Sequence, residues 1–596
     1  MRIHTDQVGY LSNSDKKAVV VLPEGMKAED VKLFVENAET GERTDIPVGV
    51  SAAVYDETAG EYVCRADITG LSGSGRYRIA ADDGSVSPAF SVSGDVYDEA
   101  LKSICKAFYF QRCGTNLPEE YAGVFKRPEC HMEKAVLYTD NSVTLDVAGG
   151  WHDAGDFGRY PSAAATALGH LLYAYELFPE AFSGTLNIPE SGNGIPDILN
   201  ECRYELEFLL KMQDDEGGVY HKVTTLRHPE FIMPQDDHGK LYVFPVSSVA
   251  TGSVAAVFCI ASRIYEKYDP DLARRLVHAA VSAGSWLMEH KENVEFKNPE
   301  GVNTGEYDDS DDTDERLWAF VELARTDVLM ENEYDHSEAG RRQNGTSRQE
   351  KYKEAVRSAW EKLLPLHDEA IEKQREITRK NETAKRQAPV LFDGFGWTDV
   401  SGLALLSALT CADACDLFGE KILSEMKRLF MEKAEIFAEE AKASGYMLAM
   451  QGRDFVWGSN MVVTNRAGIL AAASVLSEDA GFKKECRDAA LEQLHYIFGR
   501  NAMGISYVTG FGENAFRHPH NRVTECDGIE EPIPGEVSGG PCFPPLDPVG
   551  ISNVPEGSAP QKCYVDRYES YSLNEITIYW NSSAVFTLAF AAAGEL

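Results

Sequence analysis

DVYDEALKSICKAFYF, residues 95–110, marks the point at which the hydrophobic pattern of this chain changes. Before it, segments rich in β-branched and aromatic residues are separated by Gly, Asp, Ser and Asn clusters: KAVVVL, VKLFVEN, EYVCRADI, GRYRIAA and SPAFSVS. After it, apolar residues recur with the 3.6-residue period of amphipathic helices. The sequence therefore predicts a small all-β sandwich over residues 1–93, followed by an all-α domain over residues 97–596.

Twelve apolar stripes with helical spacing make up the second part. They span residues 97–112, 161–178, 197–213, 246–266, 270–288, 312–330, 350–366, 400–417, 421–443, 460–477, 480–498 and 577–592. Residues 331–390 also contain long runs rich in charge and poor in apolar residues, which favours a solvated helix pair or a mobile loop. If that segment bordered a substrate cleft, it would close off distant subsites.

Glu575 precedes an apolar, helix-like tail in YVDRYESYSLNEITIYWNSS, residues 564–583. Burial beside such a run raises the pKa of a carboxyl group, so this Glu can stay protonated near neutrality and donate a proton. The alternative is that Glu575 caps the first turn of a terminal helix, where the helix dipole favours a negative charge.

A second acidic motif is GGWHDAGDFGRY, residues 149–160, in which Asp153 and Asp156 stand three positions apart. Its glycines allow backbone conformations that a side chain would forbid: Gly149, Gly150 and Gly155. We expect a tight loop in which one carboxylate takes a proton from water while the other orients that water. An ordinary turn is the alternative. With Glu575, the pair supplies the acid and base halves of glycosidic bond hydrolysis.

With these motifs the chain resembles glycoside hydrolase family 9, the family of many cellulases, over nearly its whole length. The terminal stretch fits one active-site pattern of that family through Tyr564, Asp566, Tyr571, Glu575, Thr577, Asn581 and Ser582. A second pattern is met by SYVTGFGENAFRHPHNR, residues 506–522, through Ser506, Val508, Thr509, Gly512, Asn514, Pro519, His520 and Arg522. The resemblance implies a six-hairpin (α/α) toroid for the helical domain. The opening DQVGY resembles the immunoglobulin-like domain that precedes it in one branch of the family.

The resemblance also implies roles for individual residues. Glu575 would be the general acid, Asp156 the general base and Asp153 its helper, in an inverting reaction that separates acid and base by about 6.5–9.5 Å. His520 and Arg522 would donate hydrogen bonds to sugar hydroxyls. Two aromatic residues, Trp457 and Tyr571, would contact the sugar, although a Trp at position 457 is equally typical of a core.

Two cysteines and two histidines form a candidate zinc site: Cys113, Cys130, His131 and His152. This set suits tetrahedral zinc, but the spacing is not that of a zinc finger, and isolated residues of these types are often core fillers. Relatives in family 9 bind zinc at the matching positions. Four protein ligands close the coordination shell, so the implied zinc is structural, and it would lock the loop that begins beside His152.

An acidic run, TGEYDDSDDTDERLWA at residues 304–319, is a candidate calcium site. Carboxylates crowded in this way are typical of solvated surface, but a hard cation would relieve their mutual repulsion. Members of family 9 bind calcium at a Ser/Thr-Gly segment followed by Asp-Glu. The implied ligands of a structural calcium are therefore Thr304, Asp314 and Glu315, with Asp311 added from the acidic run.

Composition limits the partners and the compartment. The formal net charge of -38 argues against nucleic acid or an anionic membrane as partner, whereas a neutral glucan is not repelled. The beginning of the chain lacks the apolar core of a signal peptide, and no run of about 18 apolar residues follows. We therefore expect a cytoplasmic protein whose twelve cysteines are reduced thiols, apart from the zinc pair. The oligomeric state is open.

The leading hypothesis is an inverting, endoglucanase-like hydrolase of β-1,4-glucosidic bonds in cello-oligosaccharides or soluble β-glucan. Within the same family, an exo-acting β-glucosidase or a glucosaminidase is the alternative. Two other classes also remain: a zinc-dependent hydrolase whose metal activates water beside Asp153, and a sugar-binding protein that has lost catalysis.

Overall fold

The computed structural model describes residues 1–333, 347–379 and 394–594. These residues form two compact units. One unit combines residues 1–107 with residues 434–596, and the other comprises residues 108–433.

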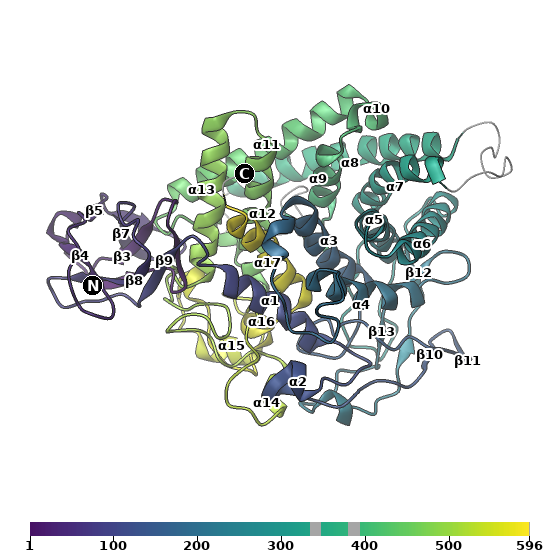
Figure 1. Cartoon of the computed structure of the whole chain (residues 1–596), viewed down its shortest axis with the longest axis horizontal. Helices are drawn as coiled ribbons and strands as arrows, with labels where there is room; N and C mark the ends of the chain where they lie inside the picture. Colours follow the sequence, from purple (N-terminus) through teal and green to yellow (C-terminus); the bar gives the residue numbers. More distant parts are fainter. Residues whose placement is uncertain (334–346, 380–393, 595–596) are drawn as a thin grey trace. The chain divides into compact units, whose positions relative to one another are not determined.

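The first unit begins with a β-sandwich of two sheets (Figure 1). One sheet has the strand order β1-β3-β7-β5, with β6 also paired to β7, and the other has the order β2-β9-β8-β4. The strands are β1 (Arg2–His4), β2 (Gly9–Leu11), β3 (Lys17–Val21), β4 (Leu33–Asn37), β5 (Gly49–Val50), β6 (Val54–Asp56), β7 (Glu61–Asp67), β8 (Gly75–Ala81) and β9 (Phe90–Ser93). Apolar side chains such as Tyr10, Val35 and Phe90 fill the space between the sheets.

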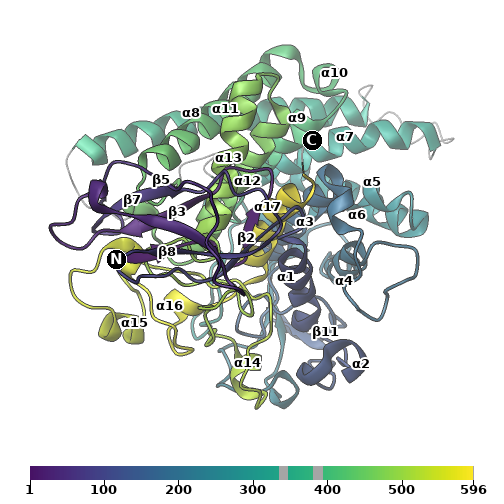
Figure 2. The same ribbon diagram turned by 60° about the vertical axis from the view of Figure 1, so that its left-hand side comes forward.

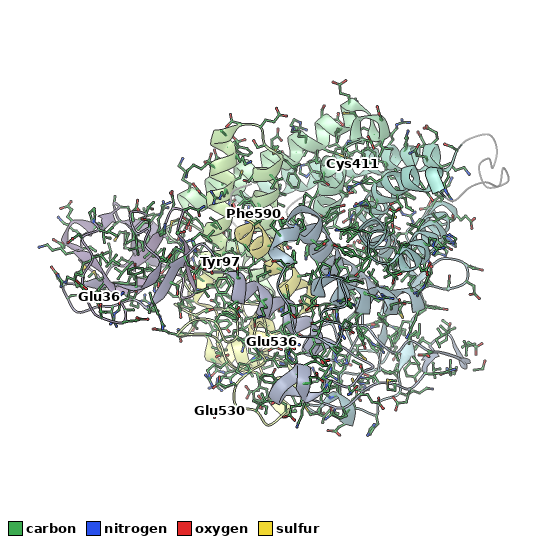
Figure 3. All side chains as sticks on the ribbon, in the orientation of Figure 1. Glu36, Tyr97, Cys411, Glu530, Glu536 and Phe590 are labelled. Carbon is green, nitrogen blue, oxygen red and sulfur yellow. The ribbon has the colours of Figure 1, made fainter. Side chains whose placement is uncertain are left out.

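Polar contacts join the sandwich to later residues of the same unit. Oδ2 of Asp6 accepts a hydrogen bond from the Tyr97 hydroxyl at 2.9 Å and lies 2.9 Å from Nδ1 of His495 (Tyr97 is labelled in Figure 3). The guanidinium of Arg65 donates to the carbonyls of Lys442 and Ser444, at 2.8 and 2.6 Å. These contacts tie the first hundred residues to the last part of the chain.

The helices of the first unit gather around α12 (Ser459–Leu476), which packs against α13 (Ala480–Ile497) and α17 (Ile578–Ala592). Helix α17 is buried along nearly its whole length, and the side chain of Thr577 caps its start by accepting from the Trp580 amide at 3.1 Å. Three short helices precede it in sequence: α14 (Arg522–Cys526), α15 (Pro548–Asn553) and α16 (Tyr571–Asn574). The boundaries between the two units fall within two helices, α1 (Asp98–Gln111) and α11 (Glu420–Ala443).

The second unit is built from packed helices and two small sheets. Helix α5 packs against α3, α6 and α7, and α7 also packs against α8 and α9 (Figure 2). The helices are α2 (Glu119–Ala122), α3 (Pro161–Leu177), α4 (Asp197–Lys211), α5 (Ser248–Tyr265), α6 (Pro270–Glu289), α7 (Thr313–Glu333), α8 (Arg348–Arg379), α9 (Ser401–Thr410) and α10 (Ala414–Phe418). The sheets are β11-β10-β14-β13 and β12-β15, from β10 (Ala135–Leu137), β11 (Asp140–Leu145), β12 (Val219–Tyr220), β13 (Val223–Thr224), β14 (Tyr242–Val243) and β15 (Val246–Ser247).

The core of the second unit contains both apolar and charged side chains. Helix α5 is long and apolar enough to cross a bilayer, yet 89% of it is buried inside the protein, as in a core helix. On α7, Glu322 is fully buried and lies 2.6 Å from Arg263 and 3.1 Å from Arg325. Burial alone would raise the pKa of Glu322, but the two arginines lower it to about 2.

Each of the twelve stripes predicted to be helical contains a helix, and all five predicted strand segments contain a strand. The stripe at residues 400–417 is divided between α9 and α10. Four strands of the sandwich were not predicted, β1, β2, β5 and β6, because two or three residues are too few to show alternation. The small strands β10 to β15 were also not predicted, so the expectation of an all-α domain over residues 97–596 is corrected to a mainly helical one. In the charged segment, α8 confirms a helix as far as Arg379, while residues 334–346 and 380–393 lie outside the described part. The domain boundary at residues 93–97 stays a prediction.

Candidate active site

The loop that carries Asp153 and Asp156 is fixed by buried carboxylates of α4. Glu205 accepts from the Trp151 amide at 2.5 Å, and Glu201 accepts from the Trp151 indole at 2.9 Å. Gly150 has a φ of +75°, and a Cβ there would lie 2.6 Å from the Phe208 ring, so only glycine fits. Gly149 also has a positive φ, whereas Gly155 does not, which corrects the expectation for that third glycine.

Asp153 is 2% exposed and has one oxygen with a partner and one without. Its Oδ2 accepts a hydrogen bond from the hydroxyl of Tyr307. Its Oδ1 has no hydrogen-bond partner among the described residues. Burial raises the pKa of Asp153 well above its usual value, and the charge of Asp156 adds to the effect. A water molecule bound at Oδ1 would therefore meet an unsatisfied acceptor.

Asp156 is also buried and is held through its Oδ2. That oxygen accepts from the Gly158 amide at 3.2 Å and from the Tyr160 hydroxyl at 3.4 Å. The exposed imidazole of His228 places Nδ1 3.1 Å from the same atom. These contacts fix the direction of the carboxylate, as a general base requires.

Two aromatic residues beside this pair were not singled out in the sequence. Tyr307 has a φ of +48°, which is rare for a bulky side chain, and its ring lies 4.6 Å from that of Tyr160. The half-exposed indole of Trp397 meets the Tyr307 ring edge-on at 4.8 Å. Trp397 thus offers a surface on which a sugar ring can stack. Tyr307 lies within the acidic run of residues 304–319, where the sequence indicated a calcium site and no role for the tyrosine.

Glu575 lies in the other unit, in an extended segment between α16 and α17. Its carbonyl accepts from the Gly539 amide at 2.8 Å, and its backbone pairs in parallel with that of His520. The side chain is half-buried. Because Thr577 caps α17, the alternative that Glu575 serves as the helix cap is wrong.

Three of the residues predicted to bind sugar cluster around Tyr571, which stands four positions before Glu575. The Tyr571 ring lies 5.2 Å from that of Trp457 and 6.1 Å from that of His520. Trp457 is 43% exposed, so it is not a core residue. Nδ1 of His520 lies 2.6 Å from the Tyr568 carbonyl, which fixes the ring orientation.

Arg522 is 7% exposed and is the first residue of α14. Asn521 caps that helix and donates to the buried carboxyl of Glu536 at 2.6 Å (Glu536 is labelled in Figure 3). The segment that carries His520 and Arg522 is therefore anchored by the residue between them.

Polar residues of the terminal motif hold the segment that presents Glu575. Asp566 accepts from the amides of Arg517 and His518, at 2.8 and 2.9 Å, and from the Asn574 side chain at 2.9 Å. Asn581 accepts from the Val537 amide at 3.0 Å. These contacts explain why the motif extends well beyond the acid itself: its other members position the backbone.

The candidate zinc ligands do converge in the second unit. Nitrogen or sulfur atoms of the four buried residues all lie within 4.8 Å of one another: Cys113, Cys130, His131 and His152. Nε2 of His131 lies 3.3 Å from Oδ2 of Asp237, an outer partner of the kind that orients a metal-binding imidazole. The donor set fits tetrahedral zinc with four protein ligands, and His152 directly precedes Asp153.

The candidate calcium ligands are only partly together. Asp314 and Glu315 are buried, and the charges of Asp399 and Asp309 add to burial in raising the pKa of Asp314. Oε2 of Glu315 has no hydrogen-bond partner among the described residues. These four carboxylates form the acidic cluster.

The two other implied calcium ligands have different partners. Thr304 Oγ1 lies 3.1 Å from the Lys222 ammonium and 2.9 Å from the Thr224 hydroxyl. Asp311 is exposed and accepts from the Thr313 amide at 2.8 Å. Sequence alone missed Asp399, which follows some eighty positions later and comes near Asp314 only through the packing of α7 and α9.

Comparison with known proteins agrees with this geometry. Residues 97–588 match the family described as glycosyl hydrolase family 9, and residues 1–85 match the cellulase N-terminal Ig-like domain. The chain belongs to glycosyl hydrolase family 9. The expected order of an Ig-like sandwich followed by a helical domain is thereby confirmed.

Similar members of family 9 cover this chain almost completely. A cellodextrinase of Butyrivibrio fibrisolvens is 38% identical over 602 residues, 99% of both chains. Endoglucanase D of Acetivibrio thermocellus is 30% identical over 99% of this chain and 83% of its own length. Among solved structures, a single mutant of a thermostable endoglucanase from Alicyclobacillus acidocaldarius has a TM-score of 0.82 at 30% identity, covering 99% of both chains. A zinc-binding triple mutant of the family 9 endoglucanase J30 has a TM-score of 0.83 at 29% identity, covering 98% of this chain and 99% of its own.

Proposed function

We propose that this family 9 chain is an inverting hydrolase of β-1,4-glucosidic bonds that acts on cello-oligosaccharides and soluble β-glucan. The observation that carries the proposal is the pair of buried carboxylates, Asp153 and Asp156, in which Oδ1 of Asp153 has no partner among the described residues. A carboxylate pair with an open acceptor is what a water nucleophile requires.

Each catalytic group has a defined task in this mechanism. Asp156 takes a proton from the attacking water, and Asp153 holds that water through its open oxygen. The oxygen of the water bonds to the anomeric carbon from the face opposite the leaving group. The glycosidic C–O bond breaks as Glu575 gives its proton to the leaving oxygen. Such a reaction inverts the anomeric configuration and requires about 6.5–9.5 Å between acid and base.

The aromatic side chains near these groups favour a neutral sugar chain as substrate. Trp457 lies beside Tyr571, in the segment that presents Glu575, and Trp397 lies beside Tyr307. The acid and the aspartate pair therefore each have aromatic rings nearby in their own unit for stacking. The relative with 38% identity is named a cellodextrinase, which supports short cello-oligosaccharides as preferred substrates. Other relatives are named endoglucanases, which supports action on longer soluble chains.

Two metal ions are part of the proposal. The site of Cys113, Cys130, His131 and His152 would hold a structural zinc, and the acidic cluster would hold a structural calcium. Each ion would supply charge neutralisation and rigidity. A zinc-activated water would need an open coordination position, whereas this cluster offers four protein donors.

The test is hydrolysis by the purified full chain of cellobiose to cellohexaose, chitosan oligomers and soluble cellulose, with the first-formed anomer measured by NMR. We expect cleavage of the cello-oligosaccharides with α-anomers as initial products. β-Anomers would overturn the inverting mechanism, and an absence of cleavage in all glucans would overturn the proposed function. Preferential cleavage of chitosan oligomers would replace glucose by glucosamine as the substrate unit.

A further inference from the structure

Lys222, between β12 and β13, is a fully buried lysine whose hydrogen-bond partners are all uncharged. Its ammonium lies 2.6 Å from Oδ1 of Asn298, 2.7 Å from the Gly305 carbonyl and 3.1 Å from Oγ1 of Thr304. The Thr304 carbonyl is a fourth oxygen, at 3.5 Å. The ammonium is thus surrounded by oxygens in the way that a metal ion is.

Aromatic rings complete the surroundings of this cation. Nζ of Lys222 lies 4.8 Å from the ring centre of Phe244, 5.3 Å from that of Phe296 and 5.9 Å from that of Tyr160. Carbonyl oxygens and ring faces both favour a positive charge. A buried ammonium is costly to desolvate, and these oxygens and rings offset part of that cost.

The segment that Lys222 contacts is connected by hydrogen bonds to both aspartates of the mechanism. The amide of Gly305 donates to the Tyr160 hydroxyl at 3.1 Å, and this hydroxyl donates to Oδ2 of Asp156 at 3.4 Å. Two residues further on, the hydroxyl of Tyr307 donates to Oδ2 of Asp153. One short segment therefore contacts Asp153 directly, through Tyr307, and Asp156 indirectly, through Tyr160.

Neighbouring contacts hold the same segment but reach fewer of its atoms. His221 places Nε2 2.7 Å from the Glu306 carbonyl, and Asn298 donates to the Thr304 carbonyl at 2.8 Å. Lys222 alone among these contacts the carbonyls of both Thr304 and Gly305 as well as the Thr304 hydroxyl. Its loss would leave several buried acceptors without a donor at once.

We propose that Lys222 is a positioning residue for the hydrolytic reaction, acting as an internal cation that orders residues 304–307 so that Tyr160 and Tyr307 set the two aspartates. The inference rests on the proposed function, because it assigns Lys222 a task in the same reaction. It differs from a purely structural role, in which removal of Lys222 would lower stability and leave turnover by the folded enzyme unchanged.

Lys16 provides a matched control within the same chain. It is also fully buried, and its ammonium binds only carbonyl oxygens, those of Ser12 at 2.9 Å and Ser14 at 2.8 Å. It lies in the β-sandwich. Lys222→Met and Lys16→Met therefore remove the same chemistry from two places, only one of which touches residues 304–307.

The experiment measures kcat, KM and thermal unfolding of the full chain with cellotetraose. We expect Lys222→Met to lower kcat by about 10- to 100-fold with KM changed less than about threefold, because misplacement of reacting groups acts on turnover. Lys16→Met should keep kcat within about twofold at temperatures where it is folded. If Lys222→Met is folded and fully active, or if both variants lose activity only in proportion to unfolding, the inference is overturned.

A double-variant cycle tests the path through Tyr160. If Lys222 acts through that hydroxyl, Lys222→Met combined with Tyr160→Phe should lose little more kcat than the more impaired single variant, whereas fully multiplicative losses contradict the path. Lys222→Gln, which keeps a donor without the charge, replaces Lys222→Met should the latter not fold, with the same expectations. Wild-type protein without hydrolytic activity would refute the proposed function itself, whereas active wild type with an active Lys222 variant refutes only this inference.

Discussion

The hydroxyl of Tyr307 donates a hydrogen bond to Asp153 from a backbone held at a φ of +48°. A bulky residue rarely adopts this left-handed conformation, and such positions persist only where surrounding contacts over-determine them. Here those contacts are the rings of Tyr160 and Trp397 and the hydrogen bonds to residues 304–306. The Tyr307 hydroxyl thus occupies Oδ2 of Asp153, and Oδ1 is the oxygen that remains to bind water.

We therefore expect Tyr307→Phe to lower kcat by about 10- to 100-fold, because a buried acceptor that loses its donor costs about 1–3 kcal/mol. KM should change little, since the phenol contacts Asp153, which holds the water in the proposed mechanism. Steady-state kinetics on cellotetraose measures both values. Tyr268→Phe, which removes a phenol–phenol contact of 2.6 Å elsewhere in the same unit, is the control and should stay active. Unchanged turnover in Tyr307→Phe would remove this residue from the mechanism.

Glu575→Gln should lower hydrolysis by about 10²- to 10⁴-fold, because the amide cannot protonate the leaving oxygen. Its shape is retained, so the thermal unfolding temperature and binding of cellotetraose should match those of the wild type. Calorimetric titration and a reducing-sugar assay measure the two properties. Glu569→Gln alters an exposed carboxyl of the same segment and should have no effect. A fully active Glu575→Gln would show that another group is the acid.

Removal of zinc should destabilise the protein and reduce turnover together. We expect about one zinc per chain by metal analysis, and both Cys130→Ala and prolonged chelation should lower the unfolding temperature, because metal binding contributes to folding. Cys259→Ala, which removes a buried thiol outside the site, should keep its zinc. Chelation that stops turnover without any loss of stability would instead indicate a catalytic metal.

Calcium should stabilise the chain through the acidic cluster of Asp309, Asp314, Glu315 and Asp399. A ligand that binds only the folded state adds about 2.7 kcal/mol to the free energy of unfolding at 100 times its Kd. Thermal unfolding with and without calcium measures this gain, and Glu315→Gln should abolish it. Asp311 is exposed and is not part of the acidic cluster, so Asp311→Asn should keep the stability gained from calcium. Loss of that gain in Asp311→Asn would instead support Asp311 as a calcium ligand, as the sequence indicated.

The ion pairs of Glu322 should make stability depend on pH in the acid range. Because its pKa falls from an ordinary 4.5 to about 2, its stabilising effect is complete above about 4.5 and is lost as the pH falls through 2. The difference corresponds to about 3 kcal/mol. Urea unfolding from pH 6 to pH 2 should therefore show a smaller pH dependence in Glu322→Gln, which should also be less stable at pH 6, since Arg263 and Arg325 lose their partner. Exposed Glu361→Gln should behave as wild type.

Sequence was sufficient where the information is local. The helical period located α3, α5 and α17, and the spacing of two glycines before Trp151 indicated a tight loop. The cysteine and histidine set also proved to converge, although its members are up to 39 positions apart and only the family resemblance joined them.

Sequence was insufficient where a contact depends on packing between distant segments. Asp399 reaches the acidic cluster because α9 packs on α7, and nothing in its own neighbourhood shows this. Tyr307 and Lys222 likewise acquire their roles from partners more than eighty positions away. Thr304 was assigned to calcium from a short local match, but in the structure the hydroxyl binds an ammonium.

The contact between Asp6 and His495 joins residues 489 positions apart. At about 5–20 residues per second, the ribosome needs roughly 25–100 seconds to produce the second residue after the first. During that interval the nascent sandwich has emerged without the helices on which its buried polar groups depend. A premature stop of translation before Lys442 would thus remove Glu575 and also release an N-terminal sandwich without Lys442, Ser444 and His495, the partners of its polar groups, which makes it a natural substrate for chaperones and proteases.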